Sequence, residues 1–361
     1  MRFIIQVLSF VVVLVSCTST AEKSNEESET TNSLEKRQAG LQVVGVFETR
    51  PGNVAVGSDG RVFATMHPLG SSQIQLVEVV SKNEAVPFPS SEYQKNGAEA
   101  SDEMLDTPLG IRVDKNNNLW IIDMGQNLGK TRLIGFSIDT RKEIYRLVFP
   151  EEMAPAGSFV QDLAVDEANG WVYLADISNP GILAVNTIDN SIRRFADSRL
   201  EAEDIDMIID EKVVEFGGAP ARVAVNPITL SDDRNALFFG AMNGTSWYQI
   251  PATLFRENAS DDELSAAIEV AGPKPISDGV ATDGNGNHYF TNLPDGGIDV
   301  LSASGEFSAV IRDEAISWAD NVAVDNNGWL YITVNQLHKA PAFTGTEDLG
   351  SPPYYIYKLK L

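Results

Sequence analysis

The chain has 361 residues, and its 27 Lys and Arg residues stand against 51 Asp and Glu residues, which gives a formal net charge of −24 at pH 7. Because like charges repel, this balance argues against nucleic acid and anionic membrane surfaces as partners, and it favours a cation or a positively charged ligand. The single cysteine, Cys17, excludes an intramolecular disulfide bond.

The N-terminus carries an apolar run of 13 residues, from Phe3 to Val15. This run is shorter than the roughly 20 residues of a membrane-spanning helix and is typical of a signal-peptide core. Leu14-Val-Ser-Cys17 resembles the bacterial lipobox, whose cysteine is lipidated and becomes the mature N-terminus; an ordinary secretory signal cleaved nearby is the alternative. We therefore predict a lipoprotein signal peptide over residues 1–16, and export to the cell envelope with Cys17 lipidated.

The segment after the cysteine is polar. Residues 18–40 contain one leucine and no aromatic residue, so they cannot bury enough apolar surface to order themselves. Residues 17–40 are predicted to form a disordered acidic tether. Thr18, rather than aspartate, follows the cysteine and favours the outer membrane, on its periplasmic or its surface side. The membrane is then contacted only through the lipid.

A repeated hairpin pattern organises the remaining chain. Its best-formed copy, residues 320–335, reads DNVAVDNNGWLYITVN, with two alternating apolar runs on either side of a turn cluster. Six copies follow one another, and their first strand residues are separated by 42 to 60 residues, a period typical of arrays and propellers. These residues are Val54, Ile111, Leu163, Val223, Val280 and Val322.

Further strands are predicted between the hairpins, for example over 131–138 and 181–185, so each copy offers four strands. Alternating runs at both ends of this region, 41–48 and 355–361, can pair and leave no exposed edge. The predicted fold of residues 41–361 is therefore all-β, a six-bladed β-propeller closed by pairing of its N- and C-terminal strands. Short helices are expected only between blades, at 261–270 and 199–209.

One position of the repeat holds an exception. The residue after the first strand residue is alanine in five copies, where converging blades need a small side chain. Arg112 replaces it in the second copy. It is predicted either to clamp an anion or carboxylate in the central channel or to form an ion pair with a neighbouring blade. The five alanines are Ala55, Ala164, Ala224, Ala281 and Ala323.

The turns that enter the first strands carry most of the candidate site. Oxygen-bearing side chains precede the first strand in copies one, three, five and six, at one mouth of the channel. Such oxygens suit a small ligand or a divalent cation such as calcium, for which Asp278, Asp320 and Gln161 are the candidate ligands; the alternative is that they cap turns. The candidate ligand-binding residues here are Gln161, Asp162, Asp278, Asp320 and Asn321.

The sequence also predicts roles for the histidines and for three further polar residues. His288 occupies an inward apolar position and is predicted to be a core residue. His67 and His338 follow second strands, and His67 is retained as a candidate site residue. Asp123, Asp176 and Asn292 lie three residues past the aromatic of the second strand and are expected to tie the blades together through hydrogen bonds to backbone.

Several stretches together resemble the major royal jelly and Yellow proteins. They are Leu109-Gly-Ile-Arg-Val-Asp, Ser158-Phe-Val-Gln-Asp-Leu-Ala-Val-Asp166, Tyr248-Gln-Ile-Pro-Ala-Thr-Leu and Ser277-Asp-Gly-Val-Ala, in the order of that family. The resemblance implies a secreted six-bladed propeller with a central ligand channel. Bacterial members are often labelled as related to dopachrome tautomerase. No catalytic set is agreed for the family, so no catalytic residue is carried over.

The chain is also distantly similar to the regucalcin and gluconolactonase propellers. Their metal is held by Glu, Asn, Asn and Asp from blades one, three, four and five. The corresponding residues are Gly52, Gln161, Ala221 and Asp278, of which two lack a side-chain oxygen. This departure places a metal-dependent lactonase in doubt unless Asp162 and Asp320 substitute.

These observations predict a secreted, membrane-tethered propeller that binds a small organic ligand at the mouth of its central channel. It is expected to be a monomer and to bind no nucleic acid. The alternative is an enzyme, either of the dopachrome tautomerase or isomerase type or a divalent-metal-dependent lactonase.

Overall fold

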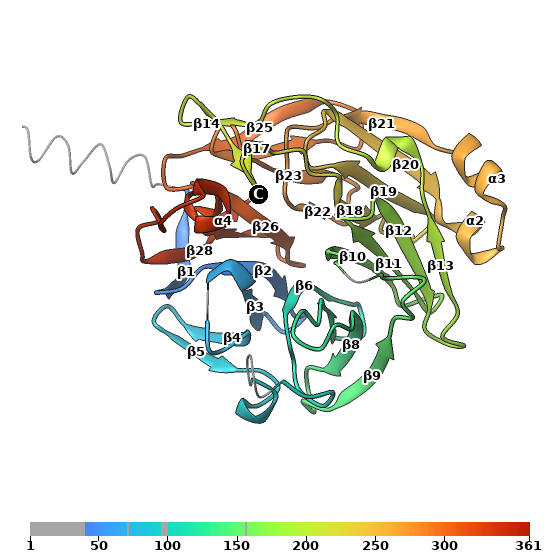
Figure 1. Cartoon of the computed structure of the whole chain (residues 1–361), viewed down its shortest axis with the longest axis horizontal. Coiled ribbons are helices and arrows are strands. Elements are labelled where there is room, and N and C mark those ends of the chain that lie inside the picture. The colour runs from blue at the N-terminus through green and yellow to red at the C-terminus, as the bar shows by residue number, and fades with distance from the viewer. Residues whose placement is uncertain (1–39, 71, 95–99, 156) are drawn as a thin grey trace, which may run out of the picture. The chain divides into compact units, whose positions relative to one another are not determined.

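A computed structural model describes residues 40–70, 72–94, 100–155 and 157–361. The predicted signal peptide, the lipidated Cys17 and the tether lie outside the described residues. Residues 41–361 form one unit, in which six four-stranded antiparallel sheets surround a central axis (Figure 1). The predicted six-bladed propeller is confirmed.

Blades one to three follow the chain in order from the axis outward. Within each blade, hydrogen bonds join consecutive strands. Blade one contains β2 (Pro51–Val56), β3 (Val62–Met66), β4 (Leu76–Ser81) and β5 (Glu84–Pro87); blade two β6 (Pro108–Val113), β7 (Asn118–Asp123), β8 (Arg132–Ser137) and β9 (Glu143–Val148); blade three β10 (Val160–Asp166), β11 (Trp171–Asp176), β12 (Gly181–Asn186) and β13 (Ile192–Phe195).

Blades four and five repeat this order, and blade six combines both ends of the chain. Blade four contains β18 (Val225–Leu230), β19 (Ala236–Ala241), β20 (Ser246–Pro251) and β21 (Glu269–Pro273); blade five β22 (Val280–Thr282), β23 (His288–Asn292), β24 (Gly297–Leu301) and β25 (Phe307–Arg312); blade six β26 (Ala319–Val324), β27 (Trp329–Val334), β28 (Tyr354–Lys360) and β1 (Gln42–Phe47).

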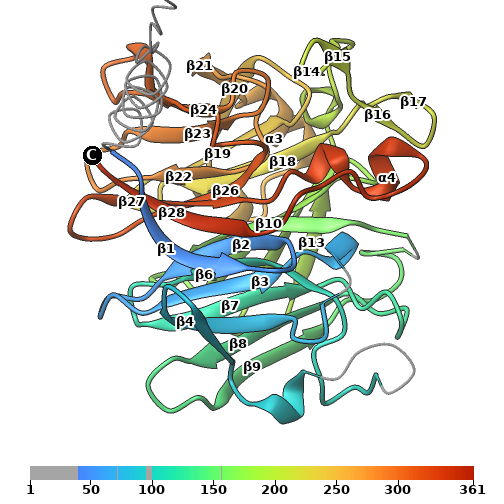
Figure 2. The same cartoon turned by 90° about the vertical axis from the view of Figure 1, so that its left-hand side faces the viewer.

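The ring closes where β1 pairs with β28 as the outermost strand of blade six, and Figure 2 shows the two strands side by side. The register places Val43 opposite Tyr357 and Phe47 opposite Tyr354. The predicted pairing of the terminal strands is confirmed. Blade six is therefore built from both ends of the chain, and hydrogen bonds within this blade close the ring.

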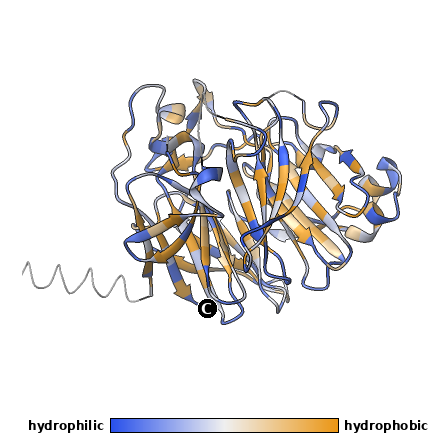
Figure 3. Ribbon diagram, turned by 90° about the horizontal axis from the view of Figure 1, so that it is seen from below, coloured by the Kyte–Doolittle hydropathy of each residue, from blue (hydrophilic) through white to orange (hydrophobic). Residues whose placement is uncertain are grey.

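Apolar residues concentrate on the strands, as the hydropathy colouring of the ribbon in Figure 3 shows. Neighbouring blades bury these side chains against each other. Between blades two and three, for example, Trp120 and Ile122 pack in one cluster with Leu163 and Val172. The alternation of apolar and polar residues in the repeat therefore becomes a series of cores between blades.

The alanine position has a clear packing reason. Each residue at this position lies directly opposite the aromatic residue of the second strand, as Ala55 opposes Phe63 and Ala323 opposes Tyr331. Arg112 opposes Trp120 in the same way. A small residue beside the axis leaves room for a channel where the blades converge.

Blade four corrects the alignment made from sequence. Ile228 opposes Phe239, as Val54 opposes Ala64 in blade one. Ile228, rather than Val223, is therefore the first strand residue, and Thr229 replaces Ala224 at the alanine position. Asn226, rather than Ala221, stands two residues before it. The run Arg222-Val-Ala-Val matches the repeat by composition, but only its last residue is in the strand.

The helical segments also differ from the prediction. Helices α2 and α3 connect β20 to β21 inside blade four, rather than joining blades. The segment 199–209 contains only part of a 3-10 turn and the first strand of a short hairpin, which a second short hairpin follows. The bounds are α2 (Ala252–Arg256), α3 (Asp261–Ala266), η4 (Ser198–Leu200), β14 (Ile208–Ile209), β15 (Lys212–Val213), β16 (Glu215–Phe216) and β17 (Ala219–Pro220).

The two hairpins β14–β17 form part of a cover at one end of the propeller. They lie on the same side as α4 (Pro341–Thr344) in Figure 2. Met207 and Val214 from this region pack with Leu337 of η5 (Leu337–Lys339) around Trp318, which is 1% exposed. This apolar cover lies at the end where the innermost strands begin. The other 3-10 turns are η1 (Pro68–Gly70) and η2 (Ser91–Tyr93).

Candidate functional site

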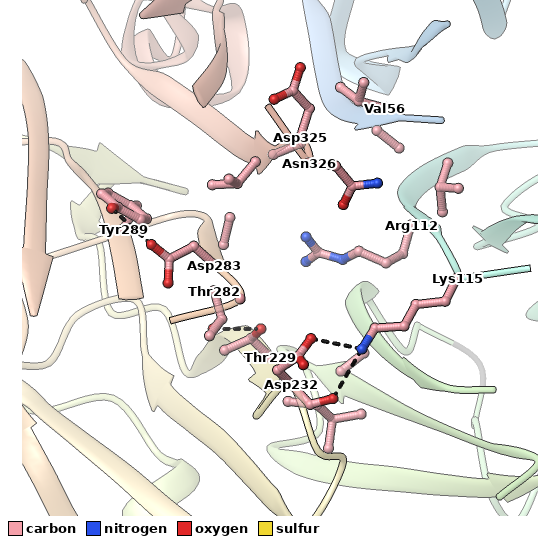
Figure 4. A pocket seen from close by; sticks show the side chains of 18 of the residues that line it. Val56, Arg112, Lys115, Thr229, Asp232, Thr282, Asp283, Tyr289, Asp325 and Asn326 are labelled. Carbon is pink, nitrogen blue, oxygen red and sulfur yellow. Dashed lines mark hydrogen bonds and ion pairs between the residues drawn. The ribbon is translucent and has the colours of Figure 1, made fainter. Parts of the chain in front are cut away.

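A cavity of about 610 Å³ occupies the axis at the end where the innermost strands finish. Its volume falls within the roughly 300–1,000 Å³ of small-molecule sites. The alanine position contributes one wall residue from every blade, as Figure 4 shows for Arg112 and Thr229. The six wall residues are Ala55, Arg112, Ala164, Thr229, Ala281 and Ala323.

Three of the four aspartates that line this cavity, Asp114, Asp283 and Asp325, cap hairpins. Both oxygens of Asp114 accept hydrogen bonds from its own turn and from the indole of Trp120. Asp283 accepts the backbone N–H groups of its turn and the hydroxyl of Tyr289, which lies 3.2 Å from Oδ2. Their negative charge surrounds the cavity, but their hydrogen-bonding capacity is used by the fold.

All three basic side chains that line the cavity pair with a carboxylate. The ammonium of Lys115 lies 2.7 Å from Asp232, and the guanidinium of Arg234 lies 3.1 Å from Glu167. The third is Arg112. Its side chain is 19% exposed and points into the cavity (Figure 4).

Arg112 joins this cavity to the opposite end of blade three. Its Nε donates to the carbonyl of Leu163 at 3.3 Å, and Nη2 donates to Oδ1 of Asp162 at 3.3 Å. Among the described residues, none accepts a hydrogen bond from Nη1. The arrangement therefore contains the ion pair with a neighbouring blade that the sequence left open, together with a donor that remains available at the cavity.

Five of the other six predicted site residues lie at the starts of the innermost strands, and His67 follows β3 at the same end of the propeller. All six are buried. A β-bulge interrupts the register there in five blades, for example between Ala319 and Val322 and between Pro51 and Val54. Bulges turn side chains out of the regular alternation. The freed N–H groups of Asn53 and Asn321 donate to the hydroxyls of Thr65 and Thr333, each at 3.0 Å, which holds the bulges in place.

Asp278 is the centre of one hydrogen-bonded group. Gln161 donates to its Oδ1 at 3.0 Å, Asn226 donates to the same oxygen at 2.5 Å, and the indole of Trp318 donates to Oδ2 at 2.8 Å. Blades three, four and five therefore meet at this carboxyl. Burial and then the nearby carboxyl of Asp320 raise its pKa well above the usual range.

Asp320 is the centre of a second group. Asn335 donates to its Oδ2 at 2.7 Å, and Asn53 donates to Oδ1 at 3.3 Å. His67 lies with Nε2 at 3.9 Å from Oδ2. Burial raises the pKa of Asp320 to about 7, while the two amide hydrogen bonds oppose the rise. Burial also raises the pKa of Asp162 to about 6, and Arg112 opposes this.

His67 is a neutral residue of the same end. Burial and then the charge of Arg50 lower its pKa to about 3. Its Nδ1 accepts the N–H of Leu69 at 3.2 Å, so the proton of the neutral ring belongs on Nε2, facing Asp320. His67 also lines a second cavity of about 110 Å³ between blades one and two.

The remaining polar assignments are structural. His288 bonds Thr282 at 2.9 Å and packs against Phe238, as predicted for a core histidine. Asp123 accepts the backbone N–H groups of Asp106, Thr107 and Gly125. These bonds go to backbone, as expected, but they fix the loops of its own blade rather than joining two blades. Asp176 and Asn292 make similar bonds near their own strands.

The positions that resemble a lactonase metal site do not fit a metal as they stand. Gly52 has no side-chain oxygen, Gln161 and Asn226 both donate through nitrogen to Asp278, and both oxygens of Asp278 are occupied. In the described part of the chain, no group of three or more His, Cys, Asp or Glu side chains is placed to hold a metal ion. The described helices also include none that is long and apolar enough to cross a membrane.

Sequence reasoning missed Asn226, Trp318 and Asn335. Asn226 was hidden by the misaligned fourth copy, whereas Asn335 ends the best-formed copy and could have been found there. Trp318 lies two residues before Asp320, at a positive φ of 55°, and nothing in the repeat marks it.

The chain resembles known proteins in sequence and in fold. A model of the family described as "Major royal jelly protein" matches residues 107–348. Major royal jelly protein 3 of Apis mellifera is 24% identical over 157 residues, which cover 40% of this chain and 28% of that protein. The match therefore spans less than a third of that relative.

Solved propellers share the fold at low identity. A gluconolactonase from Xanthomonas campestris is 12% identical with a TM-score of 0.53, covering 91% of this chain and 92% of its own. A PQQ-bound aldose sugar dehydrogenase from Streptomyces coelicolor is 12% identical with a TM-score of 0.54, covering 89% and 97%. At these identities only the fold is shared. The family match, which covers most of the propeller, shows that the chain belongs to the major royal jelly protein family.

Proposed function

We propose that this protein is an exported, membrane-tethered propeller that binds a small organic ligand in its central cavity. The observation that carries the proposal is Arg112, whose guanidinium points into a cavity of about 610 Å³ and keeps Nη1 without an acceptor among the described residues. The other cavity residues at its level are four alanines and a threonine, so this guanidinium is the distinctive group.

The lining indicates the chemistry of the ligand. A carboxylate, phenolate or carbonyl oxygen would accept from Arg112 deep in the cavity, where a charged hydrogen bond is strong. Asp283 and Asp325 at the rim favour a donor or a positive charge at the other end of the ligand by their charge alone. A small molecule with an oxygen acceptor and an amine or hydroxyl group meets both requirements.

Calorimetry with catechols, amines and lactones tests the proposal. We expect at least one class to bind with a stoichiometry of one. In Arg112→Ala its affinity should fall at least about tenfold, the worth of one charged hydrogen bond. Lys115→Ala is the matched control, because it removes a cation from the same rim that is already paired with Asp232. Binding by no class, or equal binding by Arg112→Ala, contradicts the proposal.

The proposed tether rests on the apolar run and Cys17 at the N-terminus. Expression with labelled palmitate in a bacterium should label the wild-type protein and leave Cys17→Ala unlabelled and in the soluble fraction. Membrane-free, unlabelled wild-type protein would contradict lipidation, and it would leave the ligand proposal untouched.

The alternative is an enzyme of the dopachrome tautomerase or isomerase type, or a divalent-metal-dependent lactonase. Its support is the fold shared with a gluconolactonase. Turnover of dopachrome or of a lactone by the purified protein, lost in Arg112→Ala, would favour it over simple binding. Lactone turnover that survives a chelator would argue against the metal-dependent form.

A further inference from the structure

Blade five departs from the repeat at one pair of facing positions. In the other five blades, the residue after the alanine position lies opposite an apolar residue of the second strand, as Val56 lies opposite Val62. The remaining apolar pairs are Val113 and Leu119, Val165 and Val172, Leu230 and Leu237, and Val324 and Leu330. In blade five the two positions hold Thr282 and His288, and Oγ1 of Thr282 lies 2.9 Å from Nδ1 of His288. A polar pair therefore stands where the fold elsewhere uses an apolar one.

A third departure joins this pair to the central cavity. Thr229 holds the alanine position of blade four and lines the cavity, as Thr282 does. The two hydroxyl oxygens lie 3.0 Å apart, and Figure 4 shows this contact at the cavity wall. Three departures from the repeat, on two neighbouring blades, therefore form one hydrogen-bonded network that runs from the cavity to a buried imidazole.

The imidazole is the closed end of this network. His288 is 6% exposed and packs against the rings of Phe238 and Trp247, with centroids at 4.4 and 5.9 Å. Burial lowers its pKa to about 4, against the charge of Asp283, so the ring is neutral at pH 7. A neutral ring carries one proton, and Nδ1 therefore either accepts from Thr282 or donates to it.

The state of Nδ1 fixes the direction of both hydroxyl groups. If Nδ1 accepts, Thr282 donates to it and Thr229 donates to Thr282, so the oxygen of Thr229 keeps its lone pairs for the cavity. If Nδ1 donates, Thr282 donates to Thr229, and the O–H of Thr229 is free to donate into the cavity. A hydroxyl group on a ligand fits either direction, because it both donates and accepts.

The fold alone gives no reason for this network. Five blades form the same strands with apolar pairs, and burying polar groups costs free energy unless hydrogen bonds offset it. Among the described residues, Oγ1 of Thr229 has Thr282 as its one hydrogen-bond partner, so part of its capacity faces the cavity. The cavity is therefore where the network has an effect.

We propose that Thr229, held in place by Thr282 and His288, is the second polar anchor of the ligand and binds a hydroxyl group. Arg112 lines the same cavity two blades away and holds an anionic oxygen, so the class of ligand is a small hydroxycarboxylic acid. Thr229 contacts the ligand, whereas Thr282 and His288 are positioning residues. This inference rests on the proposed ligand site and adds the group that the site selects.

Calorimetry on the full chain with benzoate, 3-hydroxybenzoate and 4-hydroxybenzoate tests this selection. The three acids share one carboxylate and one ring, so a difference in affinity reports the hydroxyl group. We expect at least one hydroxy acid to bind about three- to tenfold more tightly than benzoate, the worth of one neutral hydrogen bond. Arg112→Ala should weaken the binding of all three acids and leave this advantage in place.

The repeat itself supplies variants that the fold accepts. Thr282→Val combined with His288→Leu restores the apolar pair of the other blades, and Thr229→Ala restores the common alanine. Both proteins should unfold cooperatively near the wild-type Tm, and the advantage of the hydroxy acid should fall below about twofold. His288→Asn is the control, because its side-chain amide can donate or accept at the place of Nδ1 and should keep most of the advantage.

Nitrogen NMR of the imidazole separates this role from a purely structural one. The chain has three histidines, and the double variant identifies the signals of His288. A hydroxy acid bound at Thr229 favours one direction of the network, so it should shift the ring-nitrogen signals of His288. Benzoate should leave them unchanged.

Three results would overturn the inference. Equal affinity for benzoate and both hydroxy acids, with binding still weakened in Arg112→Ala, would remove the second anchor and keep the ligand site. An advantage that survives Thr282→Val with His288→Leu would exclude the positioning role. Binding of none of the three acids would exclude this class of ligand. An amine or lactone that then binds through Arg112 would keep the proposed function, whereas no binding by any class would contradict both.

Discussion

Lys274 provides a direct test of how the blades bury charge. Its side chain is 3% exposed, and its ammonium donates to the carbonyls of Gly244 at 2.7 Å and Pro275 at 2.9 Å. Burial lowers its pKa from 10.5 to about 7, and the charge of Glu203 opposes this only in part. The unfolded chain holds this proton up to a higher pH than the folded chain does.

The sign of the effect follows from that difference. Between pH 7 and 10.5, unfolding takes up a proton on Lys274, so the free energy of unfolding rises with pH across this window. One proton corresponds to a slope of at most about 1.4 kcal/mol per pH unit, and the whole window to at most about 5 kcal/mol. The two carbonyl hydrogen bonds reduce both values.

Urea unfolding at pH values spaced across this window measures the slope. Lys274→Met keeps the apolar stem and removes the titrating group, so its slope should be smaller than that of the wild type. The carbonyls left without a donor lower its stability by an amount that does not depend on pH, so they do not affect the comparison. Equal slopes in the two proteins would refute the reasoning.

Two further predictions concern stability alone, each with a matched control and each measured by urea unfolding. A Cβ on Gly110 would clash with the carbonyl of Gln161 in blade three, so Gly110→Ala should lower the free energy of unfolding by about 2 kcal/mol or more. The control is Gly284→Ala, whose Cβ meets nothing within 4 Å and which should change that free energy by no more than about 0.5 kcal/mol. Arg132→Met breaks a fully buried ion pair with Asp123 at 2.6 Å and should lower the free energy of unfolding by about 3–5 kcal/mol. The control is Lys115→Met, which breaks an exposed ion pair and should lower it by at most about 1 kcal/mol. Equal effects within either pair would contradict the argument.

The fold was accessible from sequence because each blade repeats one hairpin whose alternation is visible without any tertiary information. Blade four shows where prediction from the repeat fails. Arg222-Val-Ala-Val resembles the repeat better than Val225-Asn-Pro-Ile-Thr-Leu, which is the real strand. Sequence similarity to the other copies favours the wrong run, and only the pairing of Ile228 with Phe239 identifies the right one. The loss of Asn226 from the candidate site followed from that error.

The candidate site depended on features that a repeat does not encode. Bulges at the strand starts decide which side chains face the axis, and a bulge has no strong sequence signal. Which end of the channel is covered depends on Met207, Leu337 and Trp318, three residues far apart in sequence that pack together. The departure at Arg112 was visible from sequence, because it breaks a regular alanine position, but its pairing with Asp162 was not.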